Sequence, residues 1–120
     1  MKRDMELVRK MLFDFSEGKG DVKASLHDER DKEYIYHLRI MRQAGLIEYK
    51  ESKYKGGMLL YRSPTLTWQG NDYLDAISNE SVWNKTKEGV KAKGLELGNV
   101  PFSVVKECAI MQLKQLIGLQ

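Results

Sequence analysis

The chain has 120 residues, of which 42% are hydrophobic and 31% charged, a balance typical of a folded globular protein of one domain. Its formal net charge of +3 is too small to indicate a nucleic-acid partner by itself. The single cysteine, Cys108, excludes an internal disulfide framework and is typical of a reducing compartment. Because charges interrupt the N-terminal segment and no apolar run reaches roughly 18 residues, we expect a cytoplasmic protein that does not enter membranes.

The first 45 residues predict two helices with a short strand between them. Apolar residues three and four apart predict a helix over about 2–16, which ends at Gly18. A strand is expected over 21–27. Asp28 or Asp31 then caps a second helix, and Gly45 ends it. The residues expected to be buried on the two helices are Met5, Val8, Met11, Leu12, Phe15, Tyr34, Ile35, Leu38 and Met41.

A hairpin follows the second helix. Strands are expected over 46–49 and 58–62, because Gly56 and Gly57 supply the positive φ angles of a tight turn between them. The chain is expected to leave this hairpin at Pro64.

Three helices are expected in the remainder of the chain. The first, over 68–77, is capped by Thr67 and buries Trp68, Tyr73, Leu74 and Ile77. The second spans 82–93 behind a Ser81 cap, and the third runs from about Pro101 to about Ile117. Apolar residues cover more than one face of this last helix, which indicates either deep burial against the first helix or a homodimer interface.

Two short strings flank the hairpin. Arg42-Gln-Ala-Gly-Leu-Ile47 ends a helix in a glycine and enters an apolar strand, and Leu66-Thr67 with Gly70 and Leu74 opens the next helix. Together they resemble the winged-helix core of MarR- and PadR-type regulators. The resemblance implies an α+β fold, mainly α, with a winged-helix domain of helix–strand–helix–hairpin order over 1–79. C-terminal helices over 80–120 would pack on it in a single compact unit.

Further strings resemble a family of phage and prophage proteins that is catalogued as a domain of unknown function. The resemblance covers nearly the whole chain and implies no catalytic residue and no ligand. The strings are Met1–Met5, Tyr36-His37-Leu38, Ala44–Ile47, Leu66-Thr-Trp-Gln-Gly70, Val82-Trp-Asn-Lys-Thr-Lys87 and Pro101-Phe102.

The second helix departs from the DNA-reading pattern. A helix-turn-helix needs a separate short helix before the recognition helix, and the segment before Gly45 has room for one helix of about four turns. That helix also starts with Asp28-Glu-Arg-Asp-Lys-Glu33, four carboxylates against two cations. Negative charge at this end is repelled by a nucleic-acid duplex, and helix capping accounts for it without any function.

The hairpin and its flanks carry the strongest nucleic-acid signal. Three tyrosines, Tyr49, Tyr54 and Tyr61, are interleaved with cations that outnumber the two acids Glu48 and Glu51. A basic wing of this kind contacts phosphates, although the same lysines are also explained as protection of an edge strand against aggregation. The candidate nucleic-acid-binding residues are Arg39, Arg42, Lys50, Lys53, Lys55 and Arg62.

Other polar clusters favour structural roles. Lys85, Lys87, Lys91 and Lys93 are interpreted as a solvated helix face. His37 is interpreted as a hydrogen-bonded core residue and Cys108 as a small core residue, and no spacing of metal ligands, nucleophile or paired carboxylates stands out. We therefore expect no catalytic residue, no metal and no cofactor.

The sequence thus favours a non-enzymatic protein of phage or prophage type that binds nucleic acid, or acts as a regulator, through a basic wing. The alternative is a module that engages a host or phage protein without binding DNA. In that case the tyrosine-rich hairpin or the last helix forms the interface.

Overall fold

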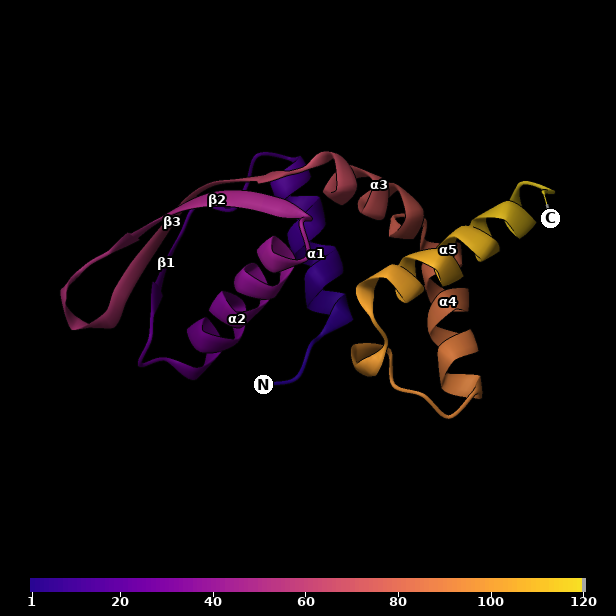
Figure 1. The fold of residues 1–120 in the computed structure, drawn as a ribbon, viewed down its shortest axis with the longest axis horizontal. Coiled ribbons are helices and arrows are strands. Elements are labelled where there is room, and N and C mark those ends of the chain that lie inside the picture. The colour runs from indigo at the N-terminus through magenta and orange to yellow at the C-terminus, as the bar shows by residue number, and fades with distance from the viewer. Residues whose placement is uncertain (120) are drawn as a thin grey trace.

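The computed structural model describes residues 1–119 (Figure 1). Helices and a small sheet alternate in the first half, and three helices complete the chain. The elements in order are α1 (Met5–Ser16), β1 (Val22–Ser25), α2 (Glu29–Gln43), β2 (Ile47–Lys53), a 3-10 turn (Lys55–Gly57), β3 (Met58–Leu66), α3 (Trp68–Ile77), α4 (Glu80–Ala92), a second 3-10 turn (Leu97–Asn99) and α5 (Phe102–Leu116).

The fold is therefore mixed α+β and mainly helical, as expected. The predicted order of helix, strand, helix and hairpin is present, and the described chain between β1 and β2 holds the one helix α2. None of the helices within residues 1–119 has the length and apolar character that a bilayer crossing requires.

The three strands form an antiparallel sheet in the order β1-β3-β2, which places β3 in the centre. Glycines 56 and 57 both have positive φ at the hairpin tip, as predicted. Both hairpin strands are longer than the sequence indicated, and Pro64 lies inside β3 rather than at its exit, which corrects that prediction. A register shift between Glu48 and Lys50 leaves an extra β3 residue at this point, and Ser63 there has φ 52°. Because a bulge needs no regular ladder bond, it tolerates a proline in a central strand.

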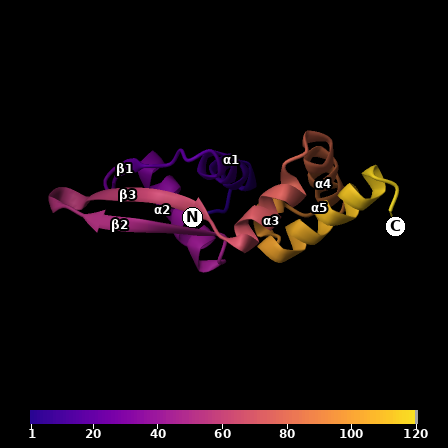
Figure 2. The ribbon, with the colours of Figure 1, turned by 90° about the horizontal axis from the view of Figure 1, so that it is seen from above.

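The core lies between the helices and one face of the sheet. All five residues expected on α1 are buried, as are Ile35, Leu38 and Met41 on α2, whereas Tyr34 is only partly buried. Alternation along the strands adds Ala24, Ile47, Leu59 and Tyr61 to this core. Figure 2 shows the sheet and α2 at one end of the molecule and the helices α3, α4 and α5 at the other.

Hydrogen bonds join the two sequence strings on either side of the hairpin. The hydroxyl of Thr67 accepts a hydrogen bond from the Gly70 N–H at 3.0 Å and donates one to the Gly45 carbonyl at 2.5 Å. The carbonyl of Leu46 accepts from the Thr67 N–H at 3.0 Å. A Cβ on Gly70 would lie 1.9 Å from that same carbonyl oxygen, so only glycine allows α3 to approach β2 this closely.

Two predictions on the C-terminal helices are wrong, and of the two alternatives for the last helix, deep burial does not hold. Trp68 is 79% exposed, because it occupies the first turn of α3 and the buried face of that helix is carried by Tyr73, Leu74 and Ile77. The cap of α4 is Asn79, whose side chain accepts from the Val82 N–H, so Ser81 lies within the helix. On α5 only Val105 and Ala109 are fully buried; the exposed apolar residues of its outer side and end are Val104, Met111, Leu116, Ile117 and Leu119.

Candidate functional site

The six cations predicted to contact nucleic acid lie in three places. Lys50 and Arg62 face each other across β2 and β3, and Lys53 and Lys55 lie at the exposed hairpin tip. Arg39 and Arg42 belong to α2. Since neighbouring residues of a strand point to opposite faces, Lys50 and Arg62 lie on the sheet face away from the buried Tyr61 and Leu59. We call this surface the outer sheet face.

The outer sheet face also contains a cation that the sequence interpretation missed. Lys23 of β1 pairs in register with Leu60 of β3 and so projects from the same face as Arg62. Among residues 1–119, Lys23, Lys50 and Arg62 form neither an ion pair nor a side-chain hydrogen bond. Acidic groups border the face at Glu48 and Asp21, and the Asp21 carboxylate accepts from the Ser63 N–H at 2.8 Å.

A shallow hollow of about 410 Å³ marks this face near the hairpin tip. Tyr54 is 54% exposed there and faces Met58 across the turn, with a hydrogen bond of 2.8 Å between their backbones. The hollow therefore combines two cations with an accessible aromatic ring, a combination that suits a phosphate backbone and a stacked base. Its lining residues are Lys23, Tyr54, Met58, Leu60 and Arg62.

Two arginines of α2, Arg39 and Arg42, are engaged within the protein. The Arg39 guanidinium lies 3.5 Å from a carboxylate oxygen of Glu51, and that oxygen also accepts a hydrogen bond of 2.7 Å from the Tyr61 hydroxyl. Burial and then this hydrogen bond raise the pKa of Tyr61 above its usual range. The Arg42 guanidinium lies 4.8 Å above the ring centre of Tyr49. Both arginines are thus separated from Lys50 and Arg62 by the sheet.

The acidic start of α2 has a structural use. Of the two caps that the sequence allowed, the structure has Asp28, whose side chain accepts from the Asp31 N–H at 3.0 Å. The Asp31 carboxylate accepts from the Ser25 N–H at 2.8 Å and so ties α2 to the end of β1. These carboxylates remain at the end of α2 that a duplex would approach in a helix-turn-helix protein.

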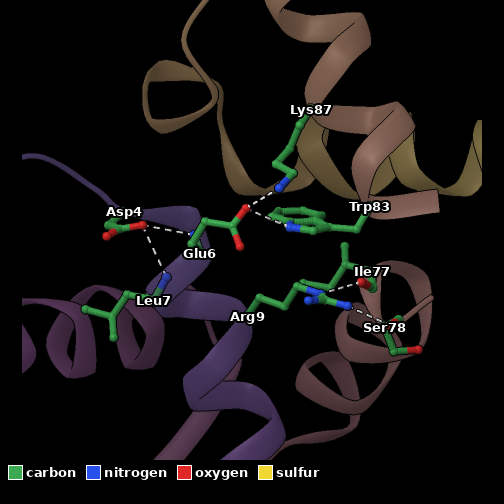
Figure 3. A network of polar contacts seen from close by, with 8 residues as sticks. All are labelled: Asp4, Glu6, Leu7, Arg9, Ile77, Ser78, Trp83 and Lys87. Carbon is green, nitrogen blue, oxygen red and sulfur yellow. Dashed lines mark hydrogen bonds and ion pairs between the residues drawn. The ribbon is translucent and has the colours of Figure 1, made fainter. Parts of the chain in front are cut away.

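Other cations join α1 to the helices α3 and α4 (Figure 3). Arg9 of α1 donates to the carbonyls of Ile77 and Ser78 at 2.9 and 2.8 Å, which are free acceptors at the end of α3. Glu6 accepts from the Trp83 ring nitrogen at 3.0 Å and from Lys87 at 2.6 Å. Lys87 is therefore part of this junction, which we call the helix junction, and the predicted lysine patch on α4 is not uniformly solvated.

His37 is a satisfied core residue, as the sequence indicated. Its ring is fully buried, and Nε2 accepts a hydrogen bond of 2.8 Å from the Asp4 N–H. Nδ1 therefore carries the proton and donates to the Glu33 carbonyl at 2.7 Å. Cys108 is only partly buried on α5. Across residues 1–119 the structure brings together no three side chains of the metal-ligating types.

Lys23 could have been found from the sequence by its alternation with Ala24 and Val22 in a short strand. Nothing in the sequence placed that strand beside the hairpin, because its partner β3 lies about 35 residues away along the chain. Arg39 and Arg42 were included in the candidate site because the sequence does not reveal their contacts. Arg39 pairs with Glu51 and Arg42 stacks on Tyr49 only once α2 packs on the sheet.

Comparisons with known proteins find one family model and a full-length relative. The model of the family described as "Hypothetical protein (DUF2513)" matches residues 2–96. An uncharacterised protein of Haemophilus influenzae (strain ATCC 51907 / DSM 11121 / KW20 / Rd) is 34% identical over 117 residues, which cover 94% of this chain and 98% of the relative. No solved structure matches the chain.

Proposed function

The chain belongs to the DUF2513 family, and from the arrangement of its cations we propose that it binds nucleic acid through the outer sheet face and the hairpin tip. The binding residues in this proposal are Lys23, Lys50, Lys53, Lys55 and Arg62. No catalytic step is proposed. The protein would act by occupying a nucleic acid, as a regulator or an architectural factor.

The observation that carries the proposal is the direct pairing of Lys50 with Arg62 on adjacent strands. Like charges opposite each other in a sheet are destabilising. Lys23 adds a third cation to the same face, and no acid within the described residues neutralises any of the three through an ion pair. An external polyanion would relieve the repulsion and release its own counterions on binding.

Phosphate contacts dominate the proposed interaction. Arg39 and Arg42 of α2 are held by Glu51 and Tyr49, and the start of α2 carries carboxylates. These features weigh against insertion of α2 into a major groove, where base edges are read. We therefore expect little sequence preference and a strong dependence of affinity on salt.

We further propose that residues 1–79 form a winged helix in which the single helix α2 takes the place of the two helices of a helix-turn-helix. The element order, the β1-β3-β2 sheet and the glycine-tipped hairpin support this assignment. A phage or prophage setting rests on the resemblance of the sequence strings alone. Both assignments are compatible with phosphate contacts through the hairpin.

The proposal is tested by fluorescence anisotropy with a labelled duplex and a labelled single strand at low salt. The wild-type chain is expected to bind, and Lys53→Glu with Lys55→Glu is expected to weaken binding by a similar factor for unrelated sequences. Lys10→Glu with Lys91→Glu reverses two exposed lysines outside the hairpin and serves as the charge-matched control.

Two outcomes would overturn the proposal. One is the absence of binding to either probe at high micromolar protein and low salt. The other is equal weakening by the hairpin variant and the control, which would show that only the net charge matters. Either result would favour the alternative function, a protein-interaction module in which the hairpin is a scaffold.

A further inference from the structure

The outer side of α5 has unpartnered apolar residues beside a groove. Met111 is 61% exposed, and Val104 on the same side is also exposed. Between α4 and α5 lies a groove of about 280 Å³ whose walls are mainly apolar. The residues that line it include Lys85, Gly89 and Lys93 of α4, and Val104, Cys108 and Met111 of α5.

Gly89 lines this groove and places no side chain in it. It lies in the middle of α4, where glycine is less favourable than alanine by roughly 1 kcal/mol. A Cβ at this position would meet no atom within 4 Å, so no contact inside the described chain requires glycine. A small residue on an open helix face instead allows a second backbone to approach closely.

The charged residues of α5 indicate which partner covers the outer side of this helix. Val104 and Met111 lie seven residues apart on the outer side of α5, with Glu107 between them and Lys114 one turn beyond Met111. Both charged residues are exposed, and neither has an ion-pair partner in the described part of the chain. Two antiparallel copies of α5 that cross at Met111 would place Glu107 of one copy opposite residue 115 of the other, one residue from Lys114. The twofold axis repeats this pairing of opposite charges on the other side of Met111.

We propose that the occupant of this surface is a second copy of the same chain, packed through α5 in an antiparallel orientation. Met111 of each copy lies at the twofold axis, and the partner helix covers the groove above Gly89. Two reciprocal pairs of Glu107 with the partner's lysine fix the direction of the helices. This inference does not depend on nucleic-acid binding.

The structure also shows where such a dimer places the sheets. α5 and the hairpin tip lie at opposite ends of a molecule 53 Å long (Figure 1). Pairing through α5 therefore leaves both outer sheet faces exposed and far apart. Two binding faces on one rigid particle would be separated widely enough to contact distant stretches of a polyanion.

The test is sedimentation equilibrium of the full chain in reducing buffer, from low micromolar to several hundred micromolar. The wild type is expected to reach twice the mass of one chain. Glu107→Lys and Lys114→Glu alone each replace two attractions by two repulsions, and each is expected to weaken dimerisation by roughly tenfold. The double variant Glu107→Lys, Lys114→Glu restores opposite charges and should return to near the wild-type dissociation constant.

A second pair of variants tests the groove. Gly89→Leu is expected to fold, because its side chain meets open space, and to abolish the dimer by filling the groove. Asn84→Leu adds the same side chain to an exposed α4 position outside the groove and should leave the dimer intact. A wild-type chain that stays monomeric, or a dimer that none of these variants affects, would overturn the proposal and leave the groove to another protein.

Discussion

Cations at the helix junction and cations on the outer sheet face have opposite surroundings. Arg9 and Lys87 at the junction donate to carbonyls or to Glu6, and each lies near the Trp83 ring, at 5.7 and 5.8 Å from its centre. Lys50 and Arg62 on the sheet face each other without an ion-pair partner in residues 1–119. The contrast separates charges that stabilise the fold from charges available to a ligand. Changes at the junction should lower stability, and changes on the sheet face should lower binding.

The largest expected effect is that of Trp83→Ala. Trp83 is 1% exposed and is the largest fully buried side chain, and its ring nitrogen is bonded to Glu6. We expect its removal to lower the free energy of unfolding by about 4 kcal/mol, measured by urea titration. Trp68→Ala is the matched control and should change stability by less than about 0.5 kcal/mol, since Trp68 is exposed. Similar losses for the two variants would contradict the assignment of the core.

Gly70→Ala should have the next largest effect. The added Cβ would collide with the Leu46 carbonyl and force α3 away from β2. We expect a loss of about 2 to 3 kcal/mol in the free energy of unfolding. Gly89→Ala is the control, since its Cβ meets open space, and it should raise the stability of the monomer. A neutral Gly70→Ala would mean that the two strings are not locked as described.

These glycines show how much of the fold could be predicted from the sequence. The strings around Gly45 and Gly70 indicated the end of one helix and the start of the next, and both lie where the sequence placed them. The periodic apolar stripe of α1 was likewise sufficient to predict its buried face. The exposed Trp68 could not be predicted, because a large apolar residue next to a helix cap fits a buried pattern until the direction of the helix is known.

The candidate site was only partly predictable. Lys50 and Arg62 were found because the hairpin is local, and local pairing follows from the turn. Lys23 was missed because the third strand comes from a distant segment. The bulge at Ser63 and Pro64 also sets which residues face outward, and the Ser63 N–H there donates to Asp21, a contact that alternation along the strand does not reveal.

Arg9→Met should have an intermediate effect at the junction. The variant keeps an apolar stem beside Trp83 but removes the two donors to the end of α3. We expect a loss of about 1.5 kcal/mol in the free energy of unfolding. Lys10→Met, which removes an exposed pair with Asp14, should cost less than about 0.5 kcal/mol. If both variants behave alike, Arg9 is another surface cation and the contrast with the sheet face disappears.

A smaller effect on stability is expected at low pH. Partial burial acts to raise the pKa of Glu6, but the hydrogen bonds from Lys87 and Trp83 outweigh it and leave the pKa below its usual range. The stability from this pair is therefore present above the pKa of an unfolded glutamate and is lost as the pH falls through the lower, folded pKa. Because Lys87 and Glu6 are partly exposed, the contribution should be at most about 1 kcal/mol. Urea titrations of wild type and Glu6→Gln should converge at low pH; a constant gap across that range would contradict this origin.

The most direct test of the contrast between the two regions is the salt dependence of nucleic-acid affinity in Lys50→Gln, Arg62→Gln. Each lost phosphate contact should reduce the slope of log K against log salt by about 0.9 on duplex DNA, so the double variant should lose about 1.8. Its free energy of unfolding should meanwhile stay level or rise by a few tenths of a kcal/mol, because a like-charged pair has been removed. An unchanged slope, or a loss of stability in place of a loss of binding, would contradict the account.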